Sequence, residues 1–278
     1  MIKLIVTDLD GSLLNDNKEL PPDFWEFEKT LRELGIVFCI ASGRPHHNLT
    51  RLFQPIKKHT YFLSDNGSYV SYNEEALLIK MLDPQIVATL VKASRGLADV
   101  YPVLCGMGKA YMEDHNEALL EQALQYYQSY QMVDDLTRVS EPVLKVSLCD
   151  LQNAETNSYP HFKKFENEYK VAVAGERWLD FTACDANKGT AVRLLQQRLG
   201  IGFNETMVFG DYMNDLEMMQ TAKYSFAMKN AHPGILNAAS FITELDNNNN
   251  GVLQTIVKIL ENPLFFNKNP VEKNRFRQ

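Results

Sequence analysis

The 278-residue sequence has few cysteines and no cluster of metal-binding residues of the zinc type. Its four cysteines, Cys39, Cys105, Cys149 and Cys184, are far apart, form no CxxC pair and stand in or beside apolar runs. Scattered thiols of this kind are typical of a reducing compartment rather than of a disulfide framework. The six histidines show no HxxxH or HxH spacing, which argues against a zinc site.

Long apolar runs and an excess of positive charge are also missing. The sequence has no run of eighteen apolar residues. Its start, MIKLIV followed by TDLDG, is typical of a first strand and not of a signal peptide. The formal net charge is -7, so we expect neither nucleic acid nor a membrane as partner. We expect a cytoplasmic protein, either a monomer or a small homo-oligomer. A weak basic cluster in the tail is interpreted as a solvated terminus; it consists of Lys268, Lys273, Arg275 and Arg277.

The two ends of the chain alternate short apolar runs with helical patterns, which is the signature of an α/β fold. Helices are predicted at 22–34, from Gly189 onward and at 251–260. Strands are predicted at 2–6, 35–41, 61–64, 68–72, 205–211, 224–228 and 241–243. Asn66-Gly67 gives the turn between 61–64 and 68–72.

The middle of the chain has a different pattern, in which strands follow one another without regular helical crossovers. Helices are predicted at 86–97, near 120–127 and near 161–168, and strands at 100–105, 109–112, 144–149, 169–175 and 178–183. This pattern is α+β with antiparallel pairs. We therefore predict a doubly wound, mostly parallel α/β sheet built from 1–82 and 183–278, with an α+β domain inserted at 83–182.

Four polar motifs stand where the predicted elements of the α/β part meet. TDLDGS follows the first strand, Ser42-Gly43 follows the second, Lys188 precedes a helix, and GDYMND follows the strand at 205–211. The carboxyl ends of parallel strands share one edge of a sheet, so residues about 200 positions apart can converge there. Each motif alone is more often a turn, a helix cap or a surface residue. The four in this order are not interpreted as chance.

The motifs together indicate phosphoryl transfer. Asp8, Asp10, Asp211 and Asp215 would repel one another without a cation, and an all-oxygen set suits Mg²⁺. Lys188 would add positive charge for a phosphate. The Ser42 hydroxyl and the backbone N–H groups near Gly11-Ser12 and Ser42-Gly43 are suitable donors to the phosphate oxygens. Two carboxylates two residues apart on a strand allow a nucleophile beside an acid/base.

These motifs resemble those of the haloacid dehalogenase-like phosphatases. The DxDGT motif of that family matches Asp8–Ser12, with Ser12 in place of the usual Thr; Ser42, Lys188 and Gly210–Asp215 match its other three motifs. The inserted domain resembles a C2-type cap, and the chain looks most similar to bacterial sugar phosphatases of the Cof-like branch. Shorter segments also resemble that branch: Asn66-Gly67, Ala227–Ala231 and Asn250–Val252. In the second of these, Lys229 replaces a usual Gly.

The resemblance implies a Rossmann-like core and a Mg²⁺-dependent phosphoric monoester hydrolase. Asp8 would attack phosphorus and Asp10 would be the acid/base. Mg²⁺ would be held by Asp8, the backbone carbonyl of Asp10 and Asp211, while Asp215 orients a metal-bound water or Lys188. The substrate, a small phosphorylated molecule and by resemblance a sugar phosphate, would be selected by the cap. The phosphate would be held by Ser42, Gly43, Lys188, Asn214 and Gly11.

Two other readings stay open at the level of sequence. A sugar phosphomutase of the same fold would use the same Asp8-based site. A phospho-aspartate switch without catalysis, like a response-regulator receiver, also combines acidic residues, a Ser or Thr and a Lys. Receivers are about half as long and lack an inserted domain. A binding protein that has lost catalysis is disfavoured because all the expected catalytic residues are present.

Overall fold

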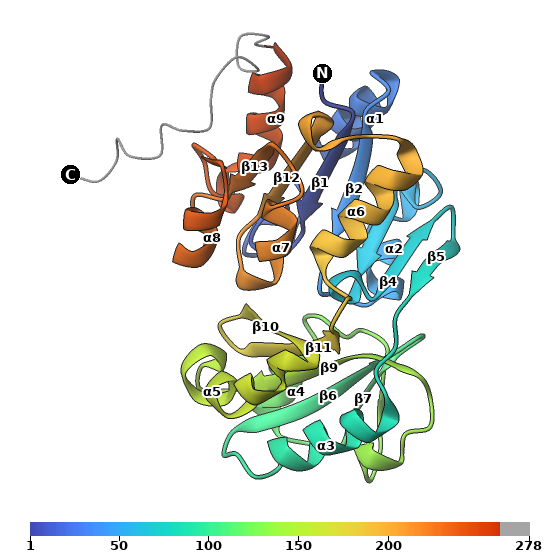
Figure 1. Cartoon of the computed structure of the whole chain (residues 1–278), viewed down its shortest axis with the longest axis vertical. Coiled ribbons are helices and arrows are strands. Elements are labelled where there is room, and N and C mark those ends of the chain that lie inside the picture. Colours follow the sequence, from blue (N-terminus) through green and yellow to red (C-terminus); the bar gives the residue numbers. More distant parts are fainter. Residues whose placement is uncertain (262–278) are drawn as a thin grey trace, which may run out of the picture. The chain divides into compact units, whose positions relative to one another are not determined.

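The computed structural model describes residues 1–261, whose strands form two sheets (Figure 1). The first sheet has eight strands in the order β14-β13-β12-β1-β2-β3-β4-β5. These strands are β1 (Leu4–Asp8), β2 (Val37–Ala41), β3 (Tyr61–Ser64), β4 (Tyr69–Tyr72), β5 (Glu75–Ile79), β12 (Thr206–Gly210), β13 (Tyr224–Ala227) and β14 (Phe241–Ile242).

The strands β14, β13, β12, β1 and β2 pair in parallel, whereas β3, β4 and β5 pair antiparallel. Every residue of β1 and of β12 is buried, as expected for central strands that are covered on both faces. The register sets Asp8 opposite Ala41, the last residue of β2. The predicted α/β fold with a mostly parallel sheet is therefore confirmed.

Helices connect these strands and cover the apolar sheet. They are α1 (Phe24–Glu33), α2 (His46–Leu52), α6 (Lys188–Leu199), α7 (Leu216–Met219), α8 (Pro233–Ala238) and α9 (Gly251–Glu261). The helix α1 buries Phe24 and Leu31 and ends before Gly35, whose φ of 72° is left-handed. α6 and α7 pack against each other (Figure 1). None of the helices among residues 1–261 is long and apolar enough to cross a membrane.

The second sheet has six strands in the order β10-β11-β9-β6-β7-β8. Its strands are β6 (Val100–Gly106), β7 (Ala110–Met112), β8 (Tyr130–Met132), β9 (Val143–Asp150), β10 (Tyr169–Gly175) and β11 (Trp178–Ala183). The helices of this segment are α3 (Pro84–Ser94), α4 (Glu117–Ala123) and α5 (Tyr159–Phe162). All pairs are antiparallel except β7 with β8, so the predicted α+β character of the middle segment is confirmed.

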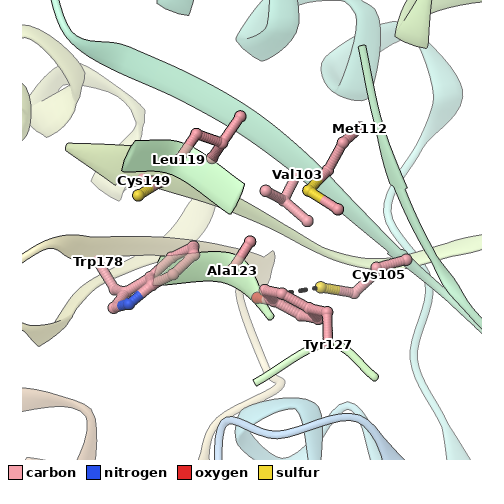
Figure 2. Packing of buried hydrophobic residues seen from close by; sticks show 9 residues of the cluster. Val103, Cys105, Met112, Leu119, Ala123, Tyr127, Cys149 and Trp178 are labelled. Carbon is pink, nitrogen blue, oxygen red and sulfur yellow. Dashed lines mark hydrogen bonds between the residues drawn. The ribbon is translucent and has the colours of Figure 1, made fainter. Parts of the chain in front are cut away.

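A buried apolar cluster joins β6, β7, β9 and β11 to α4 (Figure 2). Val103, Met112 and Leu119 are fully buried in it, and the Trp178 ring packs edge-on against Tyr127. Two thiols, Cys105 and Cys149, are packed here as small apolar side chains, as the sequence indicated.

Two predicted helices of the middle segment are wrong in their bounds. The helix expected near 120–127 is α4, which starts earlier because the Asn116 side chain caps it, accepting from the N–H groups of Ala118 and Leu119. The helix expected near 161–168 is an irregular series of turns over 154–167, of which only α5 is α-helical.

The contacts of the chain divide it into two compact units. One comprises residues 1–41 and the described residues from 188 onward, and the other comprises 42–187. An inserted domain at 83–182 stays a prediction. The basic cluster predicted in the tail lies outside the described residues.

Candidate active site

Asp8 is the last residue of β1, and its side chain is buried at the carboxyl end of that strand. The chain then turns sharply, with the N–H of Leu13 donating to the Asp8 carbonyl. Gly11 has a φ of 78°, and a Cβ at this position would lie 2.3 Å from Oδ2 of Asp211. Only a glycine therefore fits between the first and the fourth motif.

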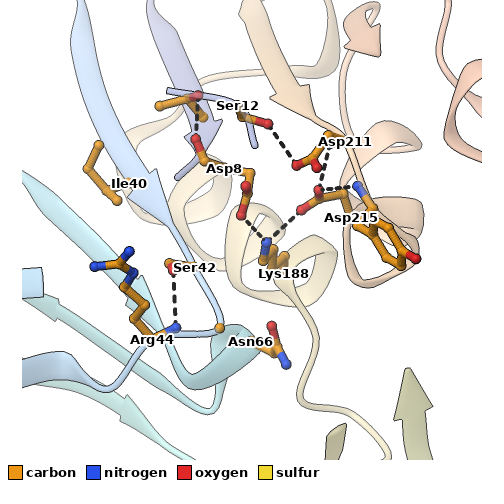
Figure 3. A network of polar contacts seen from close by, with 12 residues as sticks. Asp8, Ser12, Ile40, Ser42, Arg44, Asn66, Lys188, Asp211 and Asp215 are labelled. Atoms are coloured by element: carbon orange, nitrogen blue, oxygen red, sulfur yellow. Dashed lines mark hydrogen bonds and ion pairs between the residues drawn. The ribbon is translucent and has the colours of Figure 1, made fainter. Parts of the chain in front are cut away.

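Lys188, the first residue of α6, joins two of the predicted carboxylates (Figure 3). Its fully buried Nζ lies 2.5 Å from Oδ1 of Asp8 and 2.6 Å from Oδ1 of Asp215. The next residue, Gly189, lets α6 approach α7, because a Cβ there would lie 2.6 Å from the carbonyl group of Glu217. The third motif thus positions an ammonium group by close helix packing.

The fourth motif forms a turn after β12, in which backbone N–H groups of the motif donate to one of its own carboxylates. Oδ2 of Asp215 accepts from the N–H groups of Asp211 and Tyr212, at 3.0 and 3.2 Å. Gly210 allows this, since a Cβ there would lie 2.6 Å from the Asp215 carboxyl. Asn214 is buried in the same turn, which is a 3₁₀ turn over Met213–Asp215.

The site carries more buried negative than positive charge. Asp8, Asp211 and Asp215 each offer an oxygen, and these three oxygens lie within 4.8 Å of one another. Burial raises the pKa of Asp8 to about 7, although the Lys188 charge opposes the shift. Burial, with repulsion from Asp8 and Asp215, also raises the pKa of Asp211 well above 3.8. Electrostatics alone therefore disfavours full ionisation of this group of carboxylates.

These residues fit a divalent cation. Asp8, Asp211 and Asp215 are oxygen donors, which is the ligand type that Mg²⁺ prefers. A cation would offset the excess negative charge that Lys188 alone does not balance. Ser12 donates from Oγ to Oδ1 of Asp211 at 3.0 Å and so orients one of the donors.

Asp10, the predicted acid/base, does not belong to the buried carboxylate group. Its side chain is 22% exposed, and Oδ1 lies 3.0 Å from Nζ of Lys18. Lys18 has a φ of 64° and lies in the same loop as Asp16. The Asp16 carboxylate accepts hydrogen bonds from the side chains of Asn247 and Asn248. No sequence pattern predicts this ion pair, because it depends on how the loop folds back.

Ser42 and Gly43 belong to the other compact unit and directly follow β2 in the chain. Ser42 is buried; its N–H donates to the Leu63 carbonyl at 2.8 Å, and its Oγ accepts from the N–H of Arg44 at 3.1 Å. These bonds leave the hydroxyl proton of Ser42 available as a donor.

Sequence reasoning missed one polar residue that supports the site. The side chain of Asn230 donates to the carbonyl of Gly11 at 2.8 Å and so fixes the turn after β1. Asn230 lies in the segment Ala227–Ala231, which resembles the family, but that resemblance alone assigns no role to its side chain.

Known proteins match the chain over nearly its whole length. The family model described as haloacid dehalogenase-like hydrolase matches residues 5–256. The 5-amino-6-(5-phospho-D-ribitylamino)uracil phosphatase YbjI of Escherichia coli is 30% identical over 274 residues, which cover 96% of this chain and 99% of that protein.

Solved structures share the fold of this chain. The protein SMU.1108c of Streptococcus mutans superposes with a TM-score of 0.87 at 26% identity, over 94% of this chain and all of that one. The subclass IIB sugar phosphatase BT4131 gives a TM-score of 0.79 at 19% identity, over 92% of this chain and 98% of that one, which shows a common fold. The chain belongs to the haloacid dehalogenase-like hydrolases, in which it is a phosphoric monoester hydrolase.

Proposed function

We propose that this phosphatase hydrolyses small phosphomonoesters through a phospho-aspartate on Asp8, with Mg²⁺ as its cofactor. One observation carries the proposal: a buried carboxylate at the end of β1 is held by Lys188 beside two further carboxylates. Burying a lysine and three acidic groups costs desolvation free energy. A bound ligand that carries charge of its own would offset this cost.

Asp8 is the nucleophile in this proposal. Its carboxylate oxygen bonds to phosphorus while the bond from phosphorus to the alcohol oxygen breaks. Asp10 gives its proton to that oxygen, and the alcohol leaves. Asp10 then takes a proton from water, whose oxygen attacks phosphorus; inorganic phosphate leaves and the Asp8 carboxylate is restored.

The other residues of the proposed site balance the charge of the phosphoryl group and position it. Lys188 holds Asp8 in place and balances charge on the transferring group. Asp215 holds Lys188 by its ion pair. Ser42, Gly43, Asn214 and Gly11 donate to phosphate oxygens in this proposal.

Mg²⁺ would be held by Asp8, Asp211 and the backbone carbonyl of Asp10, and it would supply positive charge next to the phosphoryl oxygens. The raised pKa of Asp8, about 7, supports this assignment, because a cation favours the ionised carboxylate that the attack requires.

We infer that the substrate is a phosphorylated sugar or sugar alcohol. The YbjI phosphatase is named for a phosphorylated ribityl chain and BT4131 for sugar phosphates. Both kinds of molecule present a phosphate on a polyhydroxylated carbon chain. A cytoplasmic location is part of the proposal, because all four cysteines are free thiols.

The test is phosphate release from a panel of sugar, sugar-alcohol, nucleotide and cofactor phosphates, with Mg²⁺ and with EDTA. Asp8→Asn is compared with wild type and with Asp23→Asn, a change at an exposed residue without a side-chain capping bond. We expect release that requires both Mg²⁺ and Asp8 and is unaffected by Asp23→Asn. Equal release by a folded Asp8→Asn variant would refute the mechanism. Interconversion of hexose 1- and 6-phosphates without release would indicate a mutase.

A further inference from the structure

A second charged cluster lies in the unit that comprises residues 42–187. Lys145 on β9 and Asp180 on β11 are 2% and 3% exposed, and Nζ of Lys145 lies 3.1 Å from Oδ2 of Asp180. Oδ1 of Asp180 accepts from Oγ of Ser147 at 2.6 Å, and that Oγ accepts from the Tyr127 hydroxyl at 3.0 Å. The cluster is therefore a connected network rather than a lone ion pair.

Both members of the pair contact the segments that hold the Ser42-Gly43 turn. Nζ of Lys145 donates to the carbonyl of Gly43 at 2.7 Å. Oδ2 of Asp180 accepts from Nδ2 of Asn66 at 2.6 Å, and the N–H of Asn66 donates to the carbonyl of Ser42 at 3.0 Å. The pair thus fixes this turn through two consecutive carbonyl groups.

The third carbonyl of the turn is held as well. The N–H of Asp65 donates to the carbonyl of Arg44 at 3.0 Å. The carbonyls of Ser42, Gly43 and Arg44 thus all accept within the protein. In the proposed function, the donors that this turn offers to an anion are the Gly43 N–H and the Ser42 hydroxyl. The side chain of Asn66 lies close to the backbone of Gly43, because a Cβ on Gly43 would lie 3.1 Å from Oδ1 of Asn66.

A stabilising role alone does not account for this arrangement. A buried ion pair is often no more stabilising than packed apolar side chains of the same volume, because its desolvation is costly. Here one donor of Lys145 is directed at a main-chain carbonyl 102 residues away in sequence. That bond orients a turn, which apolar packing cannot do.

We propose that Lys145, supported by Asp180, is a positioning residue that sets the Ser42-Gly43 turn in its phosphate-binding conformation. The proposal rests on the proposed function, in which this turn donates to phosphate oxygens. Lys145 acts through the Gly43 carbonyl and does not contact the reacting atoms.

The test uses the full-length protein and the double variant Lys145→Met with Asp180→Asn. Replacing Lys145 alone would leave the Asp180 charge buried and unpaired, so the protein could fail to fold. The double variant removes both charges, keeps one of the two acceptor oxygens at position 180, and lacks the donor to Gly43. Lys92→Met, on the exposed side of α3, controls for the loss of a lysine.

Two readouts separate positioning from stability. The first is KM and kcat for p-nitrophenyl phosphate, and the second is calorimetric binding of inorganic phosphate in the presence of Mg²⁺. We expect the folded double variant to raise KM and to weaken phosphate binding, each by about tenfold or more, because a charged donor to the turn is lost. Lys92→Met should match wild type.

Phosphate binding equal to wild type in the folded double variant would overturn the proposal and reduce the pair to a structural role. That result leaves the proposed function intact if turnover still requires Asp8. Conversely, weakened phosphate binding in the double variant would support the positioning role even if no hydrolysis were found in any variant.

Discussion

Two glycines share a left-handed backbone conformation but differ in their surroundings. Gly11 has a φ of 78° and would meet the Asp211 carboxylate, whereas Gly35 has a φ of 72° and open space around it. We expect Gly11→Ala to lower kcat/KM by about a hundredfold or more, because a Cβ must displace Asp211. Steady-state kinetics of the purified variant measure the effect.

Gly35→Ala is the matched control. It carries the same backbone strain, which costs about 1 kcal/mol of stability, and it leaves the site untouched. If Gly35→Ala reduced kcat/KM as much as Gly11→Ala, the close approach to Asp211 would not be the cause.

Asp65 gives the free energy of unfolding a pH dependence. Burial raises its pKa from 3.8 to about 7, with repulsion from Asp180 adding to the shift and attraction by Lys145 opposing it. Between these two values the folded state holds a proton that the unfolded state releases. Stability from this group is therefore full below pH 3.8 and declines as the pH rises to 7.

Asp65→Asn removes that titration, and an asparagine tolerates the φ of 49° at this position. We expect the stability of wild type relative to Asp65→Asn to fall by about 2 kcal/mol from pH 5 to pH 7. Urea unfolding of both proteins at the two pH values measures this difference. His46, whose pKa burial lowers to about 4, contributes equally to both and cancels. A constant difference would show that Asp65 is ionised throughout.

The residues that meet at the carboxyl ends of strands could be foreseen from sequence. Asp8 ends β1 and Asp211 follows β12, two buried strands that pair directly in parallel, and Lys188 starts a helix, so their convergence follows from topology. The pair of Asp10 with Lys18 could not be foreseen, because a loop sets it. Lys145 lies in the strand predicted at 144–149, and nothing in its spacing points to Gly43.

At the scale of elements, α3 shows a capped start. Asp83 accepts at Oδ1 from the N–H of Gln85 at 2.7 Å, and Pro84 occupies the first helical position. We expect Asp83→Ala to lower the free energy of unfolding by about 1 kcal/mol and to leave kcat/KM unchanged. Chemical denaturation measures the loss. Asp83→Asn keeps a capping oxygen and should stay close to wild type, so equal losses in both variants would contradict a capping role.

Sequence patterns located the central strands and the edge strands β10 and β14, but missed the edge strands β5 and β8. β5 and β8 end their sheets, and exposed or half-exposed residues make them up, so no apolar run marks them. The short helices α7 and α8 were missed because segments of 4 and 6 residues are too short to show a helical period. The helix predicted near 161–168 is wrong in type over most of its length, because α5 ends at Phe162 and the chain continues as a 3₁₀ helix over Lys163–Asn167.

At the scale of the whole molecule, metal binding and stability are linked. A cation that binds only the folded carboxylate group stabilises it, by about 2.7 kcal/mol at a concentration a hundred times the Kd. We therefore expect saturating Mg²⁺ to raise the Tm of wild type by roughly 5 to 10 °C. Thermal unfolding with Mg²⁺ and with EDTA measures this shift without any substrate.

Asp211→Asn should change both the stability without metal and the gain in stability on adding Mg²⁺. It removes a carboxylate whose pKa is raised by burial and by its acidic neighbours, so it should be more stable than wild type in EDTA. It should gain less from Mg²⁺, because one ligand is lost. A full Mg²⁺ shift in this variant would place the cation elsewhere.

The uneven burial of the four thiols makes the protein a convenient object for spectroscopy. Cys39, Cys105 and Cys149 are buried, and burial raises their pKa, for the last two to about 12, whereas Cys184 is exposed just after β11. A maleimide dye or nitroxide added to the native enzyme should therefore attach at a single position without prior mutagenesis. Cys184 precedes Lys188 by four residues, so the emission or line shape of such a label would report conformational changes in the segment that leads into α6.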